Sequence, residues 1–389
     1  MDNGKSILLA ILSASIISCC LLLPYTPKVS AQILNEPTEH EQDINEHKEE
    51  VLEGVITKVI EEHINQQDLS PQQLYQKLEV VVTKGSLNGD TVVIESGNFS
   101  MVGQQKYKMG DKVLISYNKN PNGDSIFYIT DYIRRTPLLW LFFIFIATAI
   151  IIGRWQGLSS LLGMAFSFLI IFKLILPQIY SGANPILISI LGALVIIPAT
   201  FILSHGVNKK TGIAIISTII TLVITCLLAH FSVEAAKLTG FASEEAGFLQ
   251  AYRPEAINIK GLLLAGIIIG VLGILDDITI SQAAIVKQLK ETDPKLKIED
   301  LYTKAMAIGR DHIASMINTF VLVYAGAAMP LLLLFIGGNS QFSQIINYEV
   351  VAEEVVRILT GSIGLILAVP ITTIISAVIM DKANSDTKQ

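Results

Sequence analysis

Seven apolar runs, each long enough to cross a bilayer, follow one another between residues 137 and 380. A transmembrane helix needs about 20 apolar residues, and in lipid any open strand or loop would leave backbone polar groups unpaired. The sequence therefore predicts an α-helical polytopic membrane protein whose helices lie in a lipid bilayer. The runs are 137–153, 157–176, 185–204, 212–232, 261–286, 313–336 and 358–380.

An eighth apolar run, residues 6–23, has two interpretations. It is either a retained transmembrane anchor or a signal peptide, because Val29-Ser30-Ala31 resembles a small-residue cleavage site. Both interpretations place residues 32–136 outside the cytoplasm. The predicted divisions are an anchor or signal segment (1–31), an acidic linker (32–50), an outer β domain (51–136), a seven-helix domain (137–380) and a tail (381–389).

The composition excludes several classes of protein. Hydrophobic residues make up 51% of the chain and charged residues only 16%, against about 25% charged residues in soluble domains. A disordered chain, a typical soluble enzyme and a basic-patch nucleic-acid binder are therefore excluded.

Lys and Arg residues indicate the orientation of the helices. If the first run crosses outward, the cytoplasmic connections include Arg154, Lys209, Lys210 and the lysine-rich stretch 287–304. The excess of positive charge on one side predicts that both termini are cytoplasmic, and we expect the plasma membrane as the location. Arg134 and Arg135 are exceptions, because they lie on the predicted outer side, just before the run 137–153.

The outer domain has the pattern of a small β-barrel or sandwich. Five short segments rich in Val, Ile and aromatic residues are separated by Gly- and Asn-containing turn signals. An OB-like barrel is one fold that fits this pattern, and the sequence favours a structural or partner-binding role over a catalytic one. No basic face with interleaved aromatic residues suits nucleic acid. The predicted strands are 54–60, 78–83, 91–96, 112–117 and 125–130.

Two carboxyl groups interrupt the fifth apolar run. Residues 261–275 are too few to cross a bilayer, so the helix must continue through Asp276 and Asp277 to about Val286. The helical repeat places Asp277 on one face with small residues, which predicts a tight contact with a neighbouring helix. Asp276 is expected to lie nearer water or a cation. The small residues of that face are Gly266, Gly270, Gly273, Ser281 and Ala284.

An intramembrane carboxylate is typical of a proton or cation relay. The alternative is an aspartate that hydrogen-bonds a neighbouring helix and fixes its register. Arg310 could pair with either aspartate, and Ser281, Asn318 and Thr319 would support the relay. In the last run, Gly361 and Gly364 predict close helix packing.

Several chemistries have no sequence signal. The chain has no phosphate-binding Gly-rich loop, no His-Glu-x-x-His zinc motif and no Gly-x-Ser-x-Gly nucleophile turn. Its three cysteines, Cys19, Cys20 and Cys226, offer neither a disulfide framework nor metal-ligand spacing. We therefore expect no enzyme activity, no cofactor and no metal.

Six motifs stand out in the chain: Gly206–Thr211, Gly270–Ser281, Gly309-Arg310-Asp311, Met316–Thr319, Tyr324–Gly326 and Val356–Gly364. Together they resemble the YibE/F-like family of bacterial multi-pass membrane proteins. The resemblance covers roughly residues 135–380 and, more weakly, the outer domain. It implies the membrane architecture but no settled activity. Asp276 departs from the family, which has an apolar residue there, so Asp277 is the position that the resemblance favours.

Two functional hypotheses follow. The first is a transporter-like protein in which Asp277 relays protons or cations, as an aspartate does in the proton-driven parts of resistance-nodulation-division and SecD/SecF-type proteins. The second is a non-transporting membrane scaffold whose outer domain binds a partner. The sequence leaves the substrate, the direction of movement and the formation of a homo-oligomer open.

Overall fold

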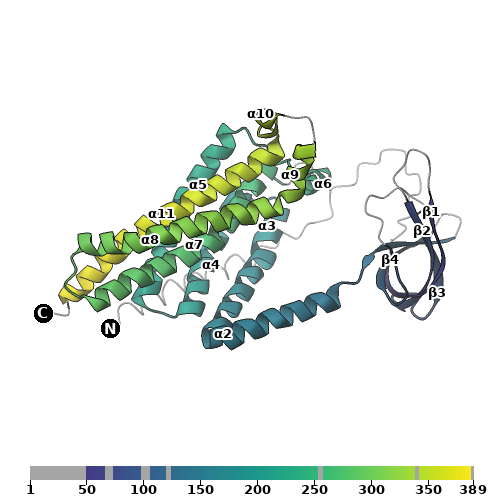
Figure 1. Ribbon diagram of the computed structural model, residues 1–389, viewed down its shortest axis with the longest axis horizontal. Coiled ribbons are helices and arrows are strands. Elements are labelled where there is room, and N and C mark those ends of the chain that lie inside the picture. The colour runs from purple at the N-terminus through teal and green to yellow at the C-terminus, as the bar shows by residue number, and fades with distance from the viewer. Residues whose placement is uncertain are drawn as a thin grey trace, which may run out of the picture. The chain divides into compact units, whose positions relative to one another are not determined.

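The computed structural model describes residues 50–65, 73–97, 106–119, 124–252, 257–337 and 341–386 (Figure 1). The chain divides into two compact units, with the boundary between Ala147 and Thr148. The anchor or signal segment (1–31) and all of the acidic linker except Glu50 lie outside the described residues. Both interpretations of the first segment therefore stay predictions.

All five predicted strands are present in the first unit, and four of them, all but the third, are longer than expected. They form one antiparallel sheet in the order β3-β2-β1-β4-β5. The sheet curves until β3 contacts β5, which makes a partial barrel of the OB-like kind. The strands are β1 (Glu50–Asn65), β2 (Gln73–Lys84), β3 (Thr91–Ser96), β4 (Lys112–Lys119) and β5 (Ser125–Tyr132).

The interior of the barrel follows the two-residue repeat of its strands. In β2, Gln76, Leu78, Val80 and Val82 are buried, whereas the residues between them are more exposed. Side chains of a strand alternate between its two faces, so every second residue reaches the core. The remaining core residues come from β1, β3, β4 and the segment before β4: Leu52, Ile56, Ile94, Tyr107, Val113 and Ile115.

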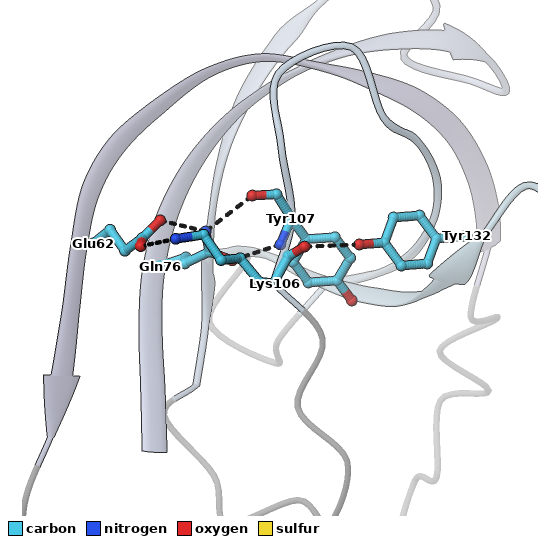
Figure 2. Close-up of polar contacts among 5 residues, drawn as sticks. All are labelled: Glu62, Gln76, Lys106, Tyr107 and Tyr132. Atoms are coloured by element: carbon cyan, nitrogen blue, oxygen red, sulfur yellow. Dashed lines mark hydrogen bonds and ion pairs between the residues drawn. The ribbon is translucent and has the colours of Figure 1, made fainter. Parts of the chain in front are cut away.

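A buried glutamine fixes the segment before β4 to the barrel (Figure 2). The Gln76 amide donates to the Tyr107 carbonyl at 3.0 Å and accepts from the Tyr107 N–H at 2.8 Å. Glu62 accepts from Gln76 at 3.1 Å and forms an ion pair with Lys106. The Tyr132 hydroxyl donates to the Lys106 carbonyl at 3.1 Å. The Gln76 side chain thus supplies hydrogen bonds that a neighbouring strand would otherwise give to the Tyr107 backbone.

The second unit is helical, and its first helix, α2, begins before the boundary between the units. Among the described residues, five helices are long and apolar enough to cross a membrane, or six if the bent pair α8–α9 is counted as one crossing. The elements are α2 (Arg135–Ile170), η1 (Ile171–Ile175), α3 (Leu176–Tyr180), α4 (Pro185–His205), α5 (Lys209–Ala235), α6 (Glu244–Tyr252), α7 (Ile259–Thr292), α8 (Ile298–Ala327), α9 (Met329–Gly337), α10 (Phe342–Ile345) and α11 (Glu349–Asp386).

Three predicted runs differ from single straight helices. Runs 137–153 and 157–176 join into one helical stretch, but Arg154 has non-helical angles (φ 49°, ψ −130°) and marks a kink between them. Run 313–336 is broken instead, because α8 and α9 meet at 67°. Pro330 lies at the start of α9, where its ring removes a backbone donor. The predicted tail (381–389) also differs from the structure, because α11 continues into it as far as Asp386.

Helix α7 contacts four other long helices, α4, α5, α8 and α11. Buried polar side chains reinforce these contacts. Thr279 lies 2.7 Å from Thr218 of α5, between their hydroxyl oxygens. The Gln282 amide donates to Thr373 of α11 at 2.7 Å and to the Ala305 carbonyl of α8 at 3.1 Å. These hydrogen bonds fix the rotation of α7 in the bundle.

Small residues allow α8 and α11 to approach their neighbours closely. A Cβ atom on Gly309 would lie 2.6 Å from Val369, and one on Gly361 would lie 2.6 Å from the Phe320 ring. At Gly364 a Cβ would lie 2.3 Å from the Thr225 hydroxyl. The glycines of α11 therefore lie at close helix contacts.

We predict that Gly364→Ala destabilises the bundle by about 1–3 kcal/mol, the usual cost of overpacking. Thr225 is buried and its hydroxyl donates to the Thr221 carbonyl at 2.8 Å, so it cannot turn away from the new methyl group. Gly266→Ala is the matched control, because no atom lies within 4 Å of its added Cβ. Thermal unfolding of the purified protein measures both variants. Equal melting temperatures for the two variants would contradict the packing.

We predict that the segment at Lys106 and Tyr107 loosens on acidification. The hydrogen bonds from Lys106 and Gln76 lower the pKa of Glu62 below its ordinary value of 4.5. A lowered folded-state pKa contributes stability above about pH 4.5, which is lost as the pH falls through the folded value. Hydrogen exchange of residues 106–110, corrected for intrinsic rates, should therefore lose protection as the pH falls below about 4.5.

The Glu62→Gln variant should already exchange faster at pH 7 and change less on acidification. The control Glu61→Gln removes a neighbouring carboxyl group that lies outside this network, and it should behave like the wild type. The same pH dependence in Glu62→Gln and wild type would show that the Glu62 carboxylate does not hold the segment.

Candidate functional site

The two aspartates of α7 line an open cavity of about 740 Å³ within the helical unit. Its walls come from the part of α2 after the kink, from α4 and from α7. Polar side chains gather in it, although the surrounding helices are apolar. They are Gln156, Ser160 and Ser167 of α2, Thr200, Ser204 and His205 of α4, and Asp276, Asp277 and Ser281 of α7.

Asp276 is the more buried of the two aspartates. Its Oδ2 accepts a hydrogen bond from Thr200 at 3.4 Å, whereas its Oδ1 is buried without a partner among the described residues. The Thr200 hydroxyl also lies 2.9 Å from the Ile196 carbonyl. One hydroxyl proton serves one acceptor well, and 3.4 Å is long for a hydrogen bond between oxygens. The Asp276 carboxyl group is thus poorly satisfied by the protein.

The orientation of the two aspartates is the reverse of the expected one. Asp277 is exposed in the cavity, whereas Asp276 shares its row with Leu272 and Ile280, which are buried. The bulky row of α7 packs into the bundle, and the small-residue row faces open space. Gly266 and Gly273 have no atom within 4 Å of an added Cβ, and at Gly270 the nearest is the Tyr324 hydroxyl at 3.3 Å.

Helix α4 supplies cavity residues that sequence reasoning missed. Thr200, Ser204 and His205 lie in its last turns, just before Gly206 ends the helix with φ 72°. Asn208 then begins α5, accepting the Thr211 N–H at 3.0 Å. Ser204 and His205 directly precede the Gly206–Thr211 motif. Their place next to this motif is the sequence signal that could have identified them as site residues.

Helix α2 forms the opposite wall. Ser160, Met164 and Ser167 are spaced by three or four residues, which places them on one helix face. Gly163 is buried beside them, and a Cβ there would lie 3.5 Å from the Ser204 hydroxyl oxygen. The small residue therefore brings α2 close to α4 at the cavity.

The other predicted site residues lie apart from this cavity. Ser281 lines it, but Arg310, Asn318 and Thr319 of α8 do not. All three are exposed, and the Thr319 hydroxyl donates to the Ser315 carbonyl at 3.1 Å. In the part of the chain that is described, no ion pair joins Arg310 to either aspartate. Gly309, the buried residue before Arg310, is the one that faces Gln282 of α7.

The donor set suits protons and cations better than a bound transition metal. Within the described ranges, no group of three or more His, Cys, Asp or Glu residues could hold a metal ion. The cavity offers two carboxyl groups, one imidazole and several hydroxyl groups. Such groups can exchange protons with water or hold a hydrated or organic cation.

A comparison with protein-family models supports the resemblance seen in the motifs. The model of the YibE/F-like protein family matches residues 141–382, more than half of the 389 residues of the chain. The match contains every cavity residue. No curated protein and no solved structure matches the chain. The chain belongs to the YibE/F-like family, and its long apolar helices are those of a multi-pass membrane protein.

Proposed function

We propose that the protein is transporter-like, with Asp276 and Asp277 as an intramembrane proton or cation relay. The observation that carries this proposal is the buried, unpartnered Oδ1 of Asp276 in a polar cavity between apolar helices. An ionised carboxylate in such surroundings is costly unless a proton or cation accompanies it. The cavity gives either of them a way to reach the group.

The two aspartates would have different tasks. Asp277 and Ser281, on the open side of α7, would receive the proton or cation. Asp276 would hold it deeper, beside Thr200. Two adjacent carboxylates repel each other when both are charged, so loading one favours release from the other. Because α7 contacts α4, α5, α8 and α11, a change in charge at this point acts on the whole bundle.

The orientation proposed from Lys and Arg places this cavity toward the cytoplasm. The helical stretch Arg135–Tyr180 has 46 residues, which at 1.5 Å per residue is about 70 Å and exceeds one bilayer core of about 30 Å. We propose that its two parts, before and after Arg154, each cross once. Together with α4, α5, α7, the α8–α9 pair and α11, this completes the seven crossings expected from the sequence.

Proton movement into liposomes tests the relay. The full-length protein would be reconstituted with a trapped pH-sensitive dye, and an imposed potassium gradient with valinomycin would drive protons inward. Asp276→Asn and Asp277→Asn should each reduce proton uptake to the rate of protein-free liposomes, since the amide cannot carry a proton. Asp300→Asn, at the exposed start of α8, is the matched control and should keep the wild-type rate.

Wild-type uptake in both aspartate variants would contradict the relay. The scaffold alternative makes the opposite prediction for two changes. If the outer domain alone carried the function, deleting residues 32–130 would abolish that function, whereas Asp276→Asn and Asp277→Asn would preserve it.

A further inference from the structure

A second cavity, separate from the aspartate site, contacts α7 near its other end. It has a volume of about 310 Å³ and lies between α6, α7, α11 and the loop that leads to α6. No residue lines both cavities. On α7 it reaches only to Gly266, whereas the aspartate cavity begins at Gly273. In the proposed orientation it faces the outer side of the membrane.

Glu353 of α11 is a buried acid in the wall of this second cavity. Its side chain belongs to a residue that is only 7% exposed. The Ala242 backbone donates one hydrogen bond to the carboxylate, but Oε1 has no partner among the described residues. A buried acceptor without a partner is costly. A ligand that donates a hydrogen bond to Oε1 would therefore remove this cost.

The loop that covers Glu353 is fixed in place. Glu349, one helical turn earlier, accepts hydrogen bonds from the Thr239 hydroxyl at 2.8 Å and from the Gly240 N–H at 3.1 Å. Gly240 has φ +88°, a conformation that glycine adopts freely. A Cβ there would lie 2.8 Å from the Ile259 carbonyl oxygen. The loop can thus lie against the start of α7 and form one wall of the cavity.

Glu353 is attracted by the charge of Arg357 but forms no ion pair with it. Arg357 is the one cation among the lining residues, and it forms an ion pair with Glu354. Glu245 adds a further negative charge at the exposed side. The rest of the wall is mostly apolar and includes Leu249, Leu262, Leu263 and Val350.

We propose that this cavity binds a small organic ammonium ion. Its N–H group would donate to Glu353 Oε1 in a charge-assisted hydrogen bond, and its alkyl part would pack against the leucine wall. A metal ion fits less well, because it needs several oxygen ligands and the described residues contain no such group of acidic side chains. The site is independent of the proposed proton relay, since equilibrium binding requires no transport.

Binding of n-butylammonium to the purified full-length protein tests the proposal. Saturation-transfer NMR would follow the titration, with n-butanol as an uncharged ligand of the same alkyl chain. Saturable binding of n-butylammonium and much weaker binding of n-butanol are expected. Glu353→Gln should weaken binding by about tenfold or more, since it removes the charge from the hydrogen bond. Glu291→Gln removes an exposed carboxyl group outside the cavity and should bind as wild type does.

Two further variants keep the outcome decisive. Leu249→Trp fills the apolar part of the cavity and should also abolish binding. This variant tests the site if Glu353→Gln does not fold. Asp276→Asn should bind normally, so a failed relay leaves this result intact. Equal binding by wild type and Glu353→Gln, equal binding of n-butanol, or displacement of n-butylammonium by sodium ions would overturn the proposal.

Discussion

A polar side chain among membrane helices must find a partner in the protein or lie in a water-filled cavity, because lipid offers none. Helix α7 shows both solutions. On its packed side, Thr279 bonds to Thr218 and Gln282 bonds to Thr373. Where α7 lines the cavity, Asp277 is exposed and the more buried Asp276 keeps an unpartnered oxygen. The first pair of contacts holds the helices together, and the second set of groups remains available for chemistry.

Much of the architecture could be predicted, since it depends on local patterns. Apolar runs of bilayer length became helices, and alternating Val and Ile segments became the five strands. Exact limits were less accessible. Strand β1 continues through exposed residues such as Glu61 and His63, which carry no apolar alternation. The bend between α8 and α9 was also missed, although Pro330 gave a signal for it.

The arrangement of the site could be predicted only in part. The helical repeat correctly separated Asp276 from Asp277, but it could not say which face of α7 packs against neighbours. That depends on residues distant in sequence, such as Gln282 and its partners in α8 and α11. The same limit explains why the predicted pairing of Arg310 with the aspartates is absent from the described residues. Gly309 packs against Gln282 and Val369, and this contact turns Arg310 away from α7. His205 was missed because histidines far apart in sequence show no cluster.

The central claim is that α7 carries a protonatable carboxyl group inside the membrane. Carbodiimide labelling followed by mass spectrometry tests it directly, because an apolar carbodiimide reacts with protonated carboxyl groups that it reaches through lipid. The account predicts modification of Asp276 or Asp277 at neutral pH, with less modification as the pH rises. An unmodified α7 peptide, under conditions that label other carboxyl groups of the chain, would contradict it.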